Sequence, residues 1–250
     1  MGIMGLKKYD IVYLVKDTPE NDELKYSLRS ICQNLSHHKV WLIGGCPNFI
    51  DKAKINHVYI EQNSRLTKWN NTNKLLMSVC DNENISDDFV LFNDDFFATK
   101  PLENIPCYYD RTLADRINDF ALKYPYSRYV FRLKQTLQTL QQHGINEPLN
   151  FELHTPMLFN KTKLKELYRR YGDSGSKRTI YGNLYYKDQA VQHPDVKCYN
   201  IYHSLASKDG LVSTTDASFR LGLVGKTIRN RFKQPCKYEM EENNERRFVS

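Results

Sequence analysis

The stretch Phe89-Val90-Leu91-Phe92-Asn93-Asp94-Asp95 decides how this chain is expected to fold. Its apolar half, rich in aromatic and branched side chains, predicts a buried strand. Its polar half marks the end of that strand. Two adjacent carboxylates beside aromatic residues are costly to bury without a partner, so the stretch is also a candidate for chemistry.

Strand and helix signals alternate on the N-terminal side of this stretch. Short apolar runs predict strands at residues 9–15, 39–43 and 57–60. Apolar residues at helical spacing predict helices at residues 20–35 and 71–80. This alternation favours an α/β fold with a mostly parallel sheet flanked by helices. Ligands of such sheets bind beyond the carboxyl ends of the strands, where the polar triplet lies.

The second half of the chain is predicted to be mainly helical. We expect helix over about 110–143, over 161–171 and from about 218 to 232. Residues 151–159 are predicted to be extended, and a short strand is expected near 211–213.

Composition excludes several classes of protein. The chain has 250 residues, of which 40% are hydrophobic and 26% charged, so it can bury a core and is not a disordered tail. No stretch approaches the roughly 20 apolar residues of a membrane helix, and residues 1–8 show no secretory signal. Six widely spaced cysteines form no C-x-x-C pair. We therefore expect reduced thiols and a cytoplasmic location.

Positive charge gathers toward the end of the chain. The net charge is +7, and Arg220–Lys237 holds six basic residues, Lys226 among them, with no acidic one. Such a run suits phosphate, nucleic acid or an anionic membrane. The alternative is a solvated helix face. Dinucleotide-binding and P-loop motifs are absent from the sequence.

The pair Asp94 and Asp95 is the first candidate for chemistry. Mg²⁺ and Mn²⁺ take oxygen ligands and are commonly held by one or two carboxylates together with substrate phosphates. We predict that both carboxylates hold such an ion and that Asn93 contacts the ligand. The alternative is a turn after the strand, where aspartate is frequent.

Three further residues are candidates, each with a structural alternative. Arg29, on the predicted helix at 20–35, can hold a phosphate or form surface salt bridges. His154, beside a proline, can be a metal ligand, a general base or a hydrogen-bonded structural residue. Asp216 can be a metal ligand, a base or a helix cap.

Taken together, these segments resemble the Stealth family and related nucleotide-sugar transferases. The stretch 21–30 (Asn-Asp-Glu-Leu-Lys-Tyr-Ser-Leu-Arg-Ser) is similar to the family's signature at its first helix, and residues 92–97 (Phe-Asn-Asp-Asp-Phe-Phe) to its Asn-Asp-Asp strand end. His154-Thr155-Pro156 is similar to its later histidine block. Residues 211–239 look like the close of glycosyltransferases from bacterial and phage surface-sugar systems.

The resemblance implies a GT-A-like fold, a nucleotide-sugar donor, a glycan or other hydroxyl acceptor and a divalent metal. Stealth proteins transfer a sugar 1-phosphate, whereas related GT-A enzymes transfer the sugar alone. The family's Trp-Val-Asp-Gly after the first strand is here Leu14-Val15-Lys16-Asp17. Residues 1–105 would then form the nucleotide-sugar half of one domain, and residues 106–250 its helical, acceptor-side half.

The resulting hypothesis is a metal-dependent transferase. Asp94 and Asp95 hold Mn²⁺ or Mg²⁺ against the diphosphate, where the metal offsets the leaving group's charge. The residues expected to contact the donor are Asp17, Arg29, Asn93 and Lys226. The residues expected to be catalytic are Asp95, His154 and Asp216. The alternative is a non-enzymatic basic module that binds nucleic acid or an anionic surface. Nucleic acid is the less expected partner, because the sequence lacks interleaved aromatic and basic residues.

Overall fold

A computed structural model describes residues 8–205 and 210–241. Its centre is a five-stranded sheet in the order β3-β2-β1-β4-β7. The strands are β3 (Asn56–Val58), β2 (Val40–Gly44), β1 (Asp10–Val15), β4 (Asp88–Phe92) and β7 (Met157–Asn160). The first four run parallel, and β7 runs antiparallel to β4. The prediction of a mostly parallel α/β sheet is therefore confirmed.

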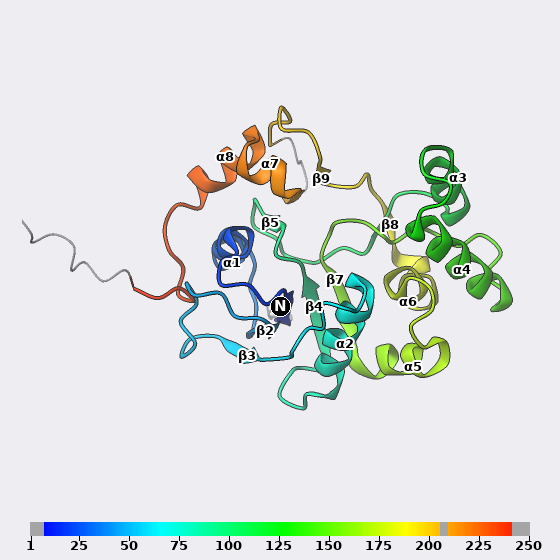
Figure 1. Cartoon of the computed structure of the whole chain (residues 1–250), viewed down its shortest axis with the longest axis horizontal. Coiled ribbons are helices and arrows are strands. Elements are labelled where there is room, and N and C mark those ends of the chain that lie inside the picture. Colours follow the sequence, from blue (N-terminus) through cyan, green and yellow to red (C-terminus); the bar gives the residue numbers. More distant parts are fainter. Residues whose placement is uncertain (1–7, 206–209, 242–250) are drawn as a thin grey trace, which may run out of the picture.

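Helices cover both faces of this sheet (Figure 1). On one face α1 (Asp22–Asn34) buries Leu24, Leu28 and Ile31 against the strands. On the other face lie α2 (Lys68–Asp81) and α5 (Lys161–Tyr171). Apolar residues at i, i+4 and i+7 make the stripe by which α1 packs.

The expected helix over 110–143 is two helices, α3 (Leu113–Lys123) and α4 (Arg128–Gln142). Pro125 lies in the break, where it lacks an N–H for a helical bond, and Ser127 caps α4 by accepting from Val130 N at 3.2 Å. The sequence did not predict α6 (Lys177–Tyr185), which begins after the N-cap Ser176. A short 3₁₀ turn, η1 (Lys187–Gln189), follows.

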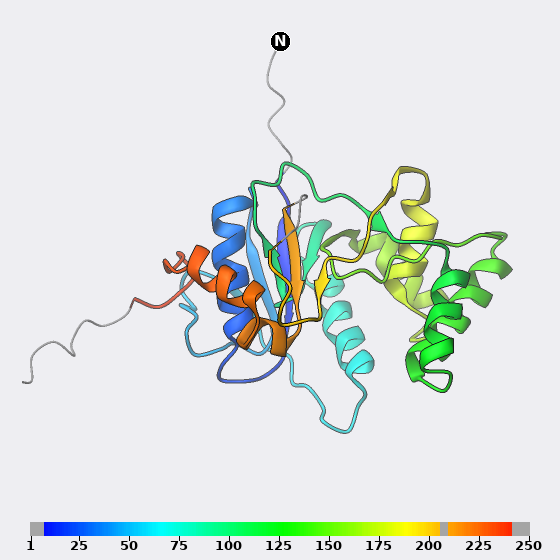
Figure 2. The same cartoon turned by 90° about the horizontal axis from the view of Figure 1, so that it is seen from above.

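The chain then returns to its first half (Figure 2). A three-stranded sheet joins β5 (Phe96–Ala98), β10 (Leu211–Thr214) and β9 (Lys197–Cys198), and β6 (Tyr108–Tyr109) pairs with β8 (Val191–Gln192). The expected helix over 218–232 is again two helices, α7 (Asp216–Arg220) and α8 (Leu223–Arg231). They separate at Gly222, where an added Cβ would lie 2.4 Å from the Ser218 carbonyl oxygen.

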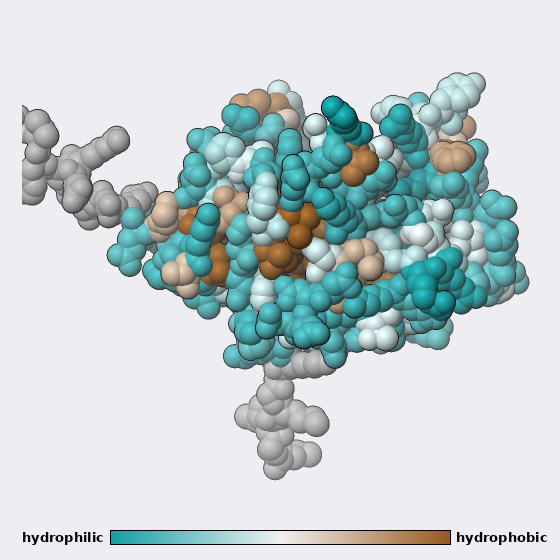
Figure 3. All heavy atoms as spheres, turned by 60° about the horizontal axis from the view of Figure 1, so that its bottom comes forward, coloured by the Kyte–Doolittle hydropathy of each residue, from teal (hydrophilic) through white to brown (hydrophobic). Residues whose placement is uncertain are grey.

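The helices α3 to α8 all lie beyond residue 106, which confirms a helical C-terminal half. Residues 151–156 carry no strand, and β7 begins only after Pro156, which cannot donate to a sheet. In the part of the chain that is described, no helix has the length and apolarity needed to cross a bilayer. All six cysteines are unpaired. Hydrophilic side chains dominate the face in Figure 3, with apolar ones in small separate patches.

Candidate functional site

A cleft of about 540 Å³ opens where the sheet changes direction. From β1 the chain moves outward through β2 and β3, then returns to place β4 on the other side of β1. Such a switch point leaves space beyond the carboxyl ends of the two central strands, where ligands of α/β sheets bind. Leu14 of β1 and Asn93, Asp94 and Asp95 after β4 line the cleft.

One side of the cleft carries three carboxylates, Glu23, Asp94 and Asp95, called here the acidic wall. Asn21 fixes Asp94: its Nδ2 donates to Asp94 Oδ2 at 2.8 Å, while its Oδ1 caps α1 by accepting from Leu24 N at 2.9 Å. The start of α1 and the end of β4 are thereby joined through one side chain.

Asp95 has two different partners. Lys197 of β9 forms an ion pair with it, and the hydroxyl of Ser213 donates to its Oδ2 at 3.1 Å. Both partners come from the three-stranded sheet, and they lie 102 and 118 residues from Asp95 in the sequence.

Burial disfavours the ionised forms of Asp94 and Glu23 in the acidic wall. It raises the pKa of Asp94, to which the charge of Asp95 adds, although the hydrogen bond from Asn21 opposes it. Burial also raises the pKa of Glu23 to about 7, against a 2.7 Å hydrogen bond from the Thr214 hydroxyl and with a further rise from Asp95 and Asp94. The wall therefore holds more negative charge than Lys197 alone balances.

This donor set fits Mg²⁺ or Mn²⁺ in chemistry, since carboxylate oxygens are the ligands that hard cations prefer and a cation would relieve the crowded charge. Among the described residues, no three His, Cys, Asp or Glu side chains converge as a closed metal site. An ion here would thus take one or two carboxylates from the protein and its other ligands from substrate or water.

His154 lines the same cleft and is paired with Asp195. Its Nδ1 lies 2.7 Å from Asp195 Oδ2, and its backbone N donates to Oδ1 at 2.9 Å. Burial raises the pKa of Asp195, but the bonds to His154 outweigh it and leave that pKa below its ordinary value. Arg178 supports the segment by donating to the Phe151 carbonyl at 2.7 Å and to the Thr155 hydroxyl at 3.1 Å.

Two other predicted residues lie at the margins of the cleft. Asp216 reaches it as the first residue of α7 and is exposed. The helix cap is Thr215, which forms a capping box with Ser218, so the alternative role of Asp216 as the cap is wrong. Asp17 follows β1 at the same sheet edge but is exposed and accepts from the Tyr59 hydroxyl at 3.2 Å, outside the residues that line the cleft.

The structure does not bring Arg29 or Lys226 into the cleft. The Arg29 guanidinium is 8% exposed and bound by both carboxylate oxygens of Glu239, at 2.7 and 2.6 Å. It also donates to the carbonyls of Phe232 and Lys233, so it anchors the end of the chain to α1. Lys226 lies exposed on α8. Neither side chain is placed to contact a ligand in the cleft, which corrects the expectation of donor contacts from them.

Three cations line another part of the cleft: Lys68, Arg132 and Lys177, called here the basic wall. Lys68 and Lys177 are the first residues of α2 and α6, and Arg132 is the fifth residue of α4. Burial, together with the charge of Arg132, lowers the pKa of Lys177 to about 8. Burial likewise lowers the pKa of Arg132.

Several of these residues were not predicted as site residues from the sequence. Asn21 and Glu23 carried a local signal, because they stand at the start of a predicted helix, within the stretch 21–30. Lys197 and Asp195 carried none, since the contacts that make them relevant join residues 102 and 41 positions apart.

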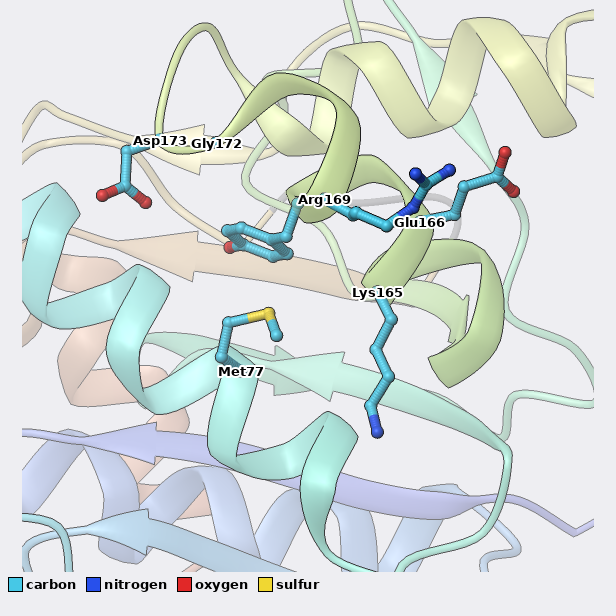
Figure 4. A pocket seen from close by; sticks show the side chains of 7 residues that line it. Met77, Lys165, Glu166, Arg169, Gly172 and Asp173 are labelled. Carbon is cyan, nitrogen blue, oxygen red and sulfur yellow. The ribbon is translucent and has the colours of Figure 1, made fainter.

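A second hollow, of about 670 Å³, lies between α2 and α5 (Figure 4). Met77 faces it from α2, and Lys165, Glu166 and Arg169 come from α5. It lies on the flank of the sheet and not at the strand ends. Lys165 is engaged by Asp81 at 2.9 Å, so this hollow offers no comparable set of groups.

No family model matches the sequence, and no curated protein matches it. Solved glycosyltransferases are similar in structure. GlyE from Streptococcus pneumoniae is 12% identical over 91% of this chain and 61% of that chain, with a TM-score of 0.47. The galactosyltransferase LgtC, in complex with donor and acceptor sugar analogues, is 10% identical over 94% of this chain and 98% of that chain, with a TM-score of 0.49. The chain thus spans about three fifths of the GlyE structure, and likeness at these levels establishes neither activity nor substrate.

Proposed function

We propose that this chain is a transferase that uses a nucleotide-sugar donor and modifies a hydroxyl group of a glycan or other surface acceptor. The observation that carries the proposal is the acidic wall at the switch point of the sheet, with Asp94 and Asp95 directly after β4. The resemblance of residues 9–165 to Stealth proteins supports the same conclusion. A GT-A-like fold and either sugar or sugar 1-phosphate transfer belong to this proposal.

Asp94 and Asp95 would hold Mn²⁺ or Mg²⁺, with Asn93 next to them. When bound, such an ion supplies positive charge against a diphosphate leaving group. The chain itself keeps both carboxylates in position, through Asn21 on one side and Lys197 on the other. Donors that are fixed before substrate arrives need no reorganisation during the reaction.

His154 is the proposed general base. Asp195 accepts from Nδ1, which leaves Nε2 as the basic nitrogen on the cleft side. The acceptor hydroxyl gives its proton to Nε2 as its oxygen bonds to the transferred group, and the bond from that group to the departing phosphate oxygen breaks. In sugar transfer the new bond is to the anomeric carbon, and in sugar 1-phosphate transfer it is to phosphorus. Asp216, at the rim, is proposed to contact the acceptor.

The test is metal-dependent binding of the donor. A panel of UDP-, GDP- and CMP-sugars is screened by thermal unfolding with and without Mn²⁺. A ligand at 100 times its Kd is expected to raise stability by about 2.7 kcal/mol, because it binds only the folded chain. Asp94→Asn should remove the Mn²⁺-dependent part of the shift.

Asp87→Asn is the matched control, since Asp87 precedes β4 at the opposite edge of the sheet and is exposed. The control should keep the full shift. Equal shifts in wild type and Asp94→Asn, or no shift with any sugar nucleotide, would contradict the proposed function.

A further inference from the structure

The basic wall is short of negative partners. Among the residues that the structure describes, no ion pair reaches Arg132, whose guanidinium lies 5.1 Å from the Trp69 ring centroid. Lys177 is 5% exposed and donates to the carbonyl of Ser174, a neutral group. Two cations, one of them almost fully buried, thus face the cleft without a carboxylate in contact.

The acids whose charges act on them are held by neutral donors, and one of these acids, Glu152, itself lines the cleft. Glu152 accepts from the hydroxyls of Ser176 and Thr179. Asp173 accepts from Asn73 Nδ2 at 2.8 Å. Both influence Arg132 only through space. Because an unpaired buried charge is unfavourable, the wall favours any anion that enters it.

The backbone adds to this preference. The helices α2 and α6 both begin at the basic wall, at Lys68 and Lys177. The first N–H groups of a helix and its dipole attract negative charge. Two helix starts therefore act on the same space as the three cations.

The two walls are distinct in their electrostatics. The charges that raise the pKa of Glu23 are those of Asp95 and Asp94. The acids that act on Arg132 and Lys177 are instead Glu152 and Asp173. Lys68 also acts on the acidic wall, since its charge lowers the pKa of Asp94. A diphosphate held at the acidic wall by a cation leaves Arg132 and Lys177 for a second anionic group.

We propose that the basic wall binds an oxyanion, a carboxylate or a phosphate, carried by the acceptor, so that the acceptor is an acidic glycan. This inference rests on the proposed transfer function. Guanidinium groups bind carboxylate and phosphate with two parallel hydrogen bonds, which suits Arg132 as the recognising residue. Lys177 contributes charge from below the surface.

The test uses Trp69, the half-buried neighbour of Arg132, as a fluorescent reporter; the only other tryptophan, Trp41, is 6% exposed in the core. Glucuronate and glucose 6-phosphate are titrated into the full chain and compared with glucose. Saturable quenching or enhancement is expected with either anionic sugar and not with glucose. The two anions tell whether carboxylate or phosphate is preferred.

Arg132→Gln should weaken anionic-sugar binding at least about tenfold, the loss typical of a charge-assisted hydrogen bond. Lys134→Gln, an exposed residue of the same helix outside the cleft, should leave it unchanged. Should Arg132→Gln unfold, Arg132→Lys takes its place: it keeps the charge but loses the paired hydrogen bonds of the guanidinium, and a loss of about threefold is expected.

Binding of UDP with Mn²⁺ is measured in the same variants. Unchanged UDP binding with weakened glucuronate or glucose 6-phosphate binding supports the proposal. Equal binding of glucose, or loss of UDP binding with no response to the anionic sugars, overturns it, the latter because the wall would then serve the donor. Failure of UDP to bind the wild type contradicts the proposed function and leaves the anionic-sugar result to decide this inference.

Discussion

The two walls of the cleft bring charge together in opposite ways. The acidic wall takes two of its three carboxylates from adjacent positions, Asp94 and Asp95, and each has a polar partner. The basic wall takes its cations from three helices, spread from Lys68 to Lys177, and within residues 8–205 and 210–241 no ion pair reaches Arg132. The acidic wall combines the end of β4 with the start of α1, whereas the basic wall exists only once three helices have packed.

This difference indicates which charge a ligand would need at each wall. Burial and the charges of neighbouring carboxylates raise the pKa of Asp94 and of Glu23, so a cation would stabilise the ionised forms of these two groups. In the basic wall, burial lowers the pKa of Arg132, and burial together with the charge of Arg132 lowers the pKa of Lys177, so an anion would stabilise these two cations. A ligand that spans both walls would carry a cation-bound diphosphate at one end and an oxyanion at the other.

The largest expected effect comes from removing charge at the acidic wall. Asp95→Asn should lower transferase turnover about 100- to 1,000-fold, the loss typical when a group that stabilises charge in the transition state is removed. Turnover is measured with the donor found by the binding screen and saturating Mn²⁺. Thermal unfolding of the variant serves as the check on folding, because Lys197 loses its partner. Turnover within tenfold of wild type would remove Asp95 from the mechanism.

Arg29 sharpens the comparison because it belongs to neither wall. Arg29→Gln should lower the free energy of unfolding by about 3–5 kcal/mol, since it leaves the 7% exposed Glu239 carboxylate buried without its partner. Chemical denaturation measures the change. The same assay on Lys25→Gln, one helical turn earlier, should give less than about 1 kcal/mol. Donor binding by the folded fraction of Arg29→Gln should stay unchanged, and a selective loss of binding would restore Arg29 as a ligand contact.

These residues show which parts of the structure can be predicted from a single sequence. The four parallel strands β1 to β4, the first two helices and the position of Asp94 and Asp95 were predictable, because apolar periodicity and a strand-end motif are local signals. The short strands β5, β6, β8 and β9 were not predicted. Arg29 was misassigned because the sequence does not display its contact with Glu239, 210 positions away. A polar side chain on an amphipathic helix looks the same whether it meets a ligand or a distant carboxylate.

The basic wall was beyond prediction for a related reason. It depends on α6, whose start follows a Gly- and Ser-containing segment that indicates a loop. It also depends on the break between α3 and α4, which sets where Arg132 lies. The sequence indicated the basic run Arg220–Lys237 as the anion-binding segment instead, but its residues lie on and after α7 and α8.

Glu23 provides a pH test of the acidic wall. Its pKa is about 7 in the folded chain and near 4.5 when unfolded, so the folded state binds more protons between these values. Stability should therefore fall as pH rises from about 4.5 to 7 and stay lower above that. Glu23→Gln should remove this fall and gain about 2 kcal/mol at pH 8, with no gain below pH 4.5.

Unfolding by denaturant at pH 4, 6 and 8 measures this effect. Glu20→Gln, an exposed residue just before α1, removes the same charge and should show no such gain. Addition of Mn²⁺ should restore wild-type stability at pH 8, because the cation offsets the same repulsion. Parallel pH profiles for wild type and Glu23→Gln would mean that Glu23 does not share the buried charge of the wall.

The smallest effect is expected from Lys226, which tests whether the basic run Arg220–Lys237 contributes to donor binding as the two walls do. Lys226 is exposed on α8 and does not line the cleft, and exposed charges are screened over about 10 Å at 0.1 M salt. Lys226→Gln should change donor affinity less than twofold, measured by titration of the donor with Mn²⁺ at 50 and 150 mM salt. The run is also partly engaged with its own helices, since Arg229 donates to carbonyl groups at the end of α7. A loss above fivefold that disappears at the higher salt would instead mean that α8 acts on the ligand through space, and the basic run would then rank with the walls as a functional surface.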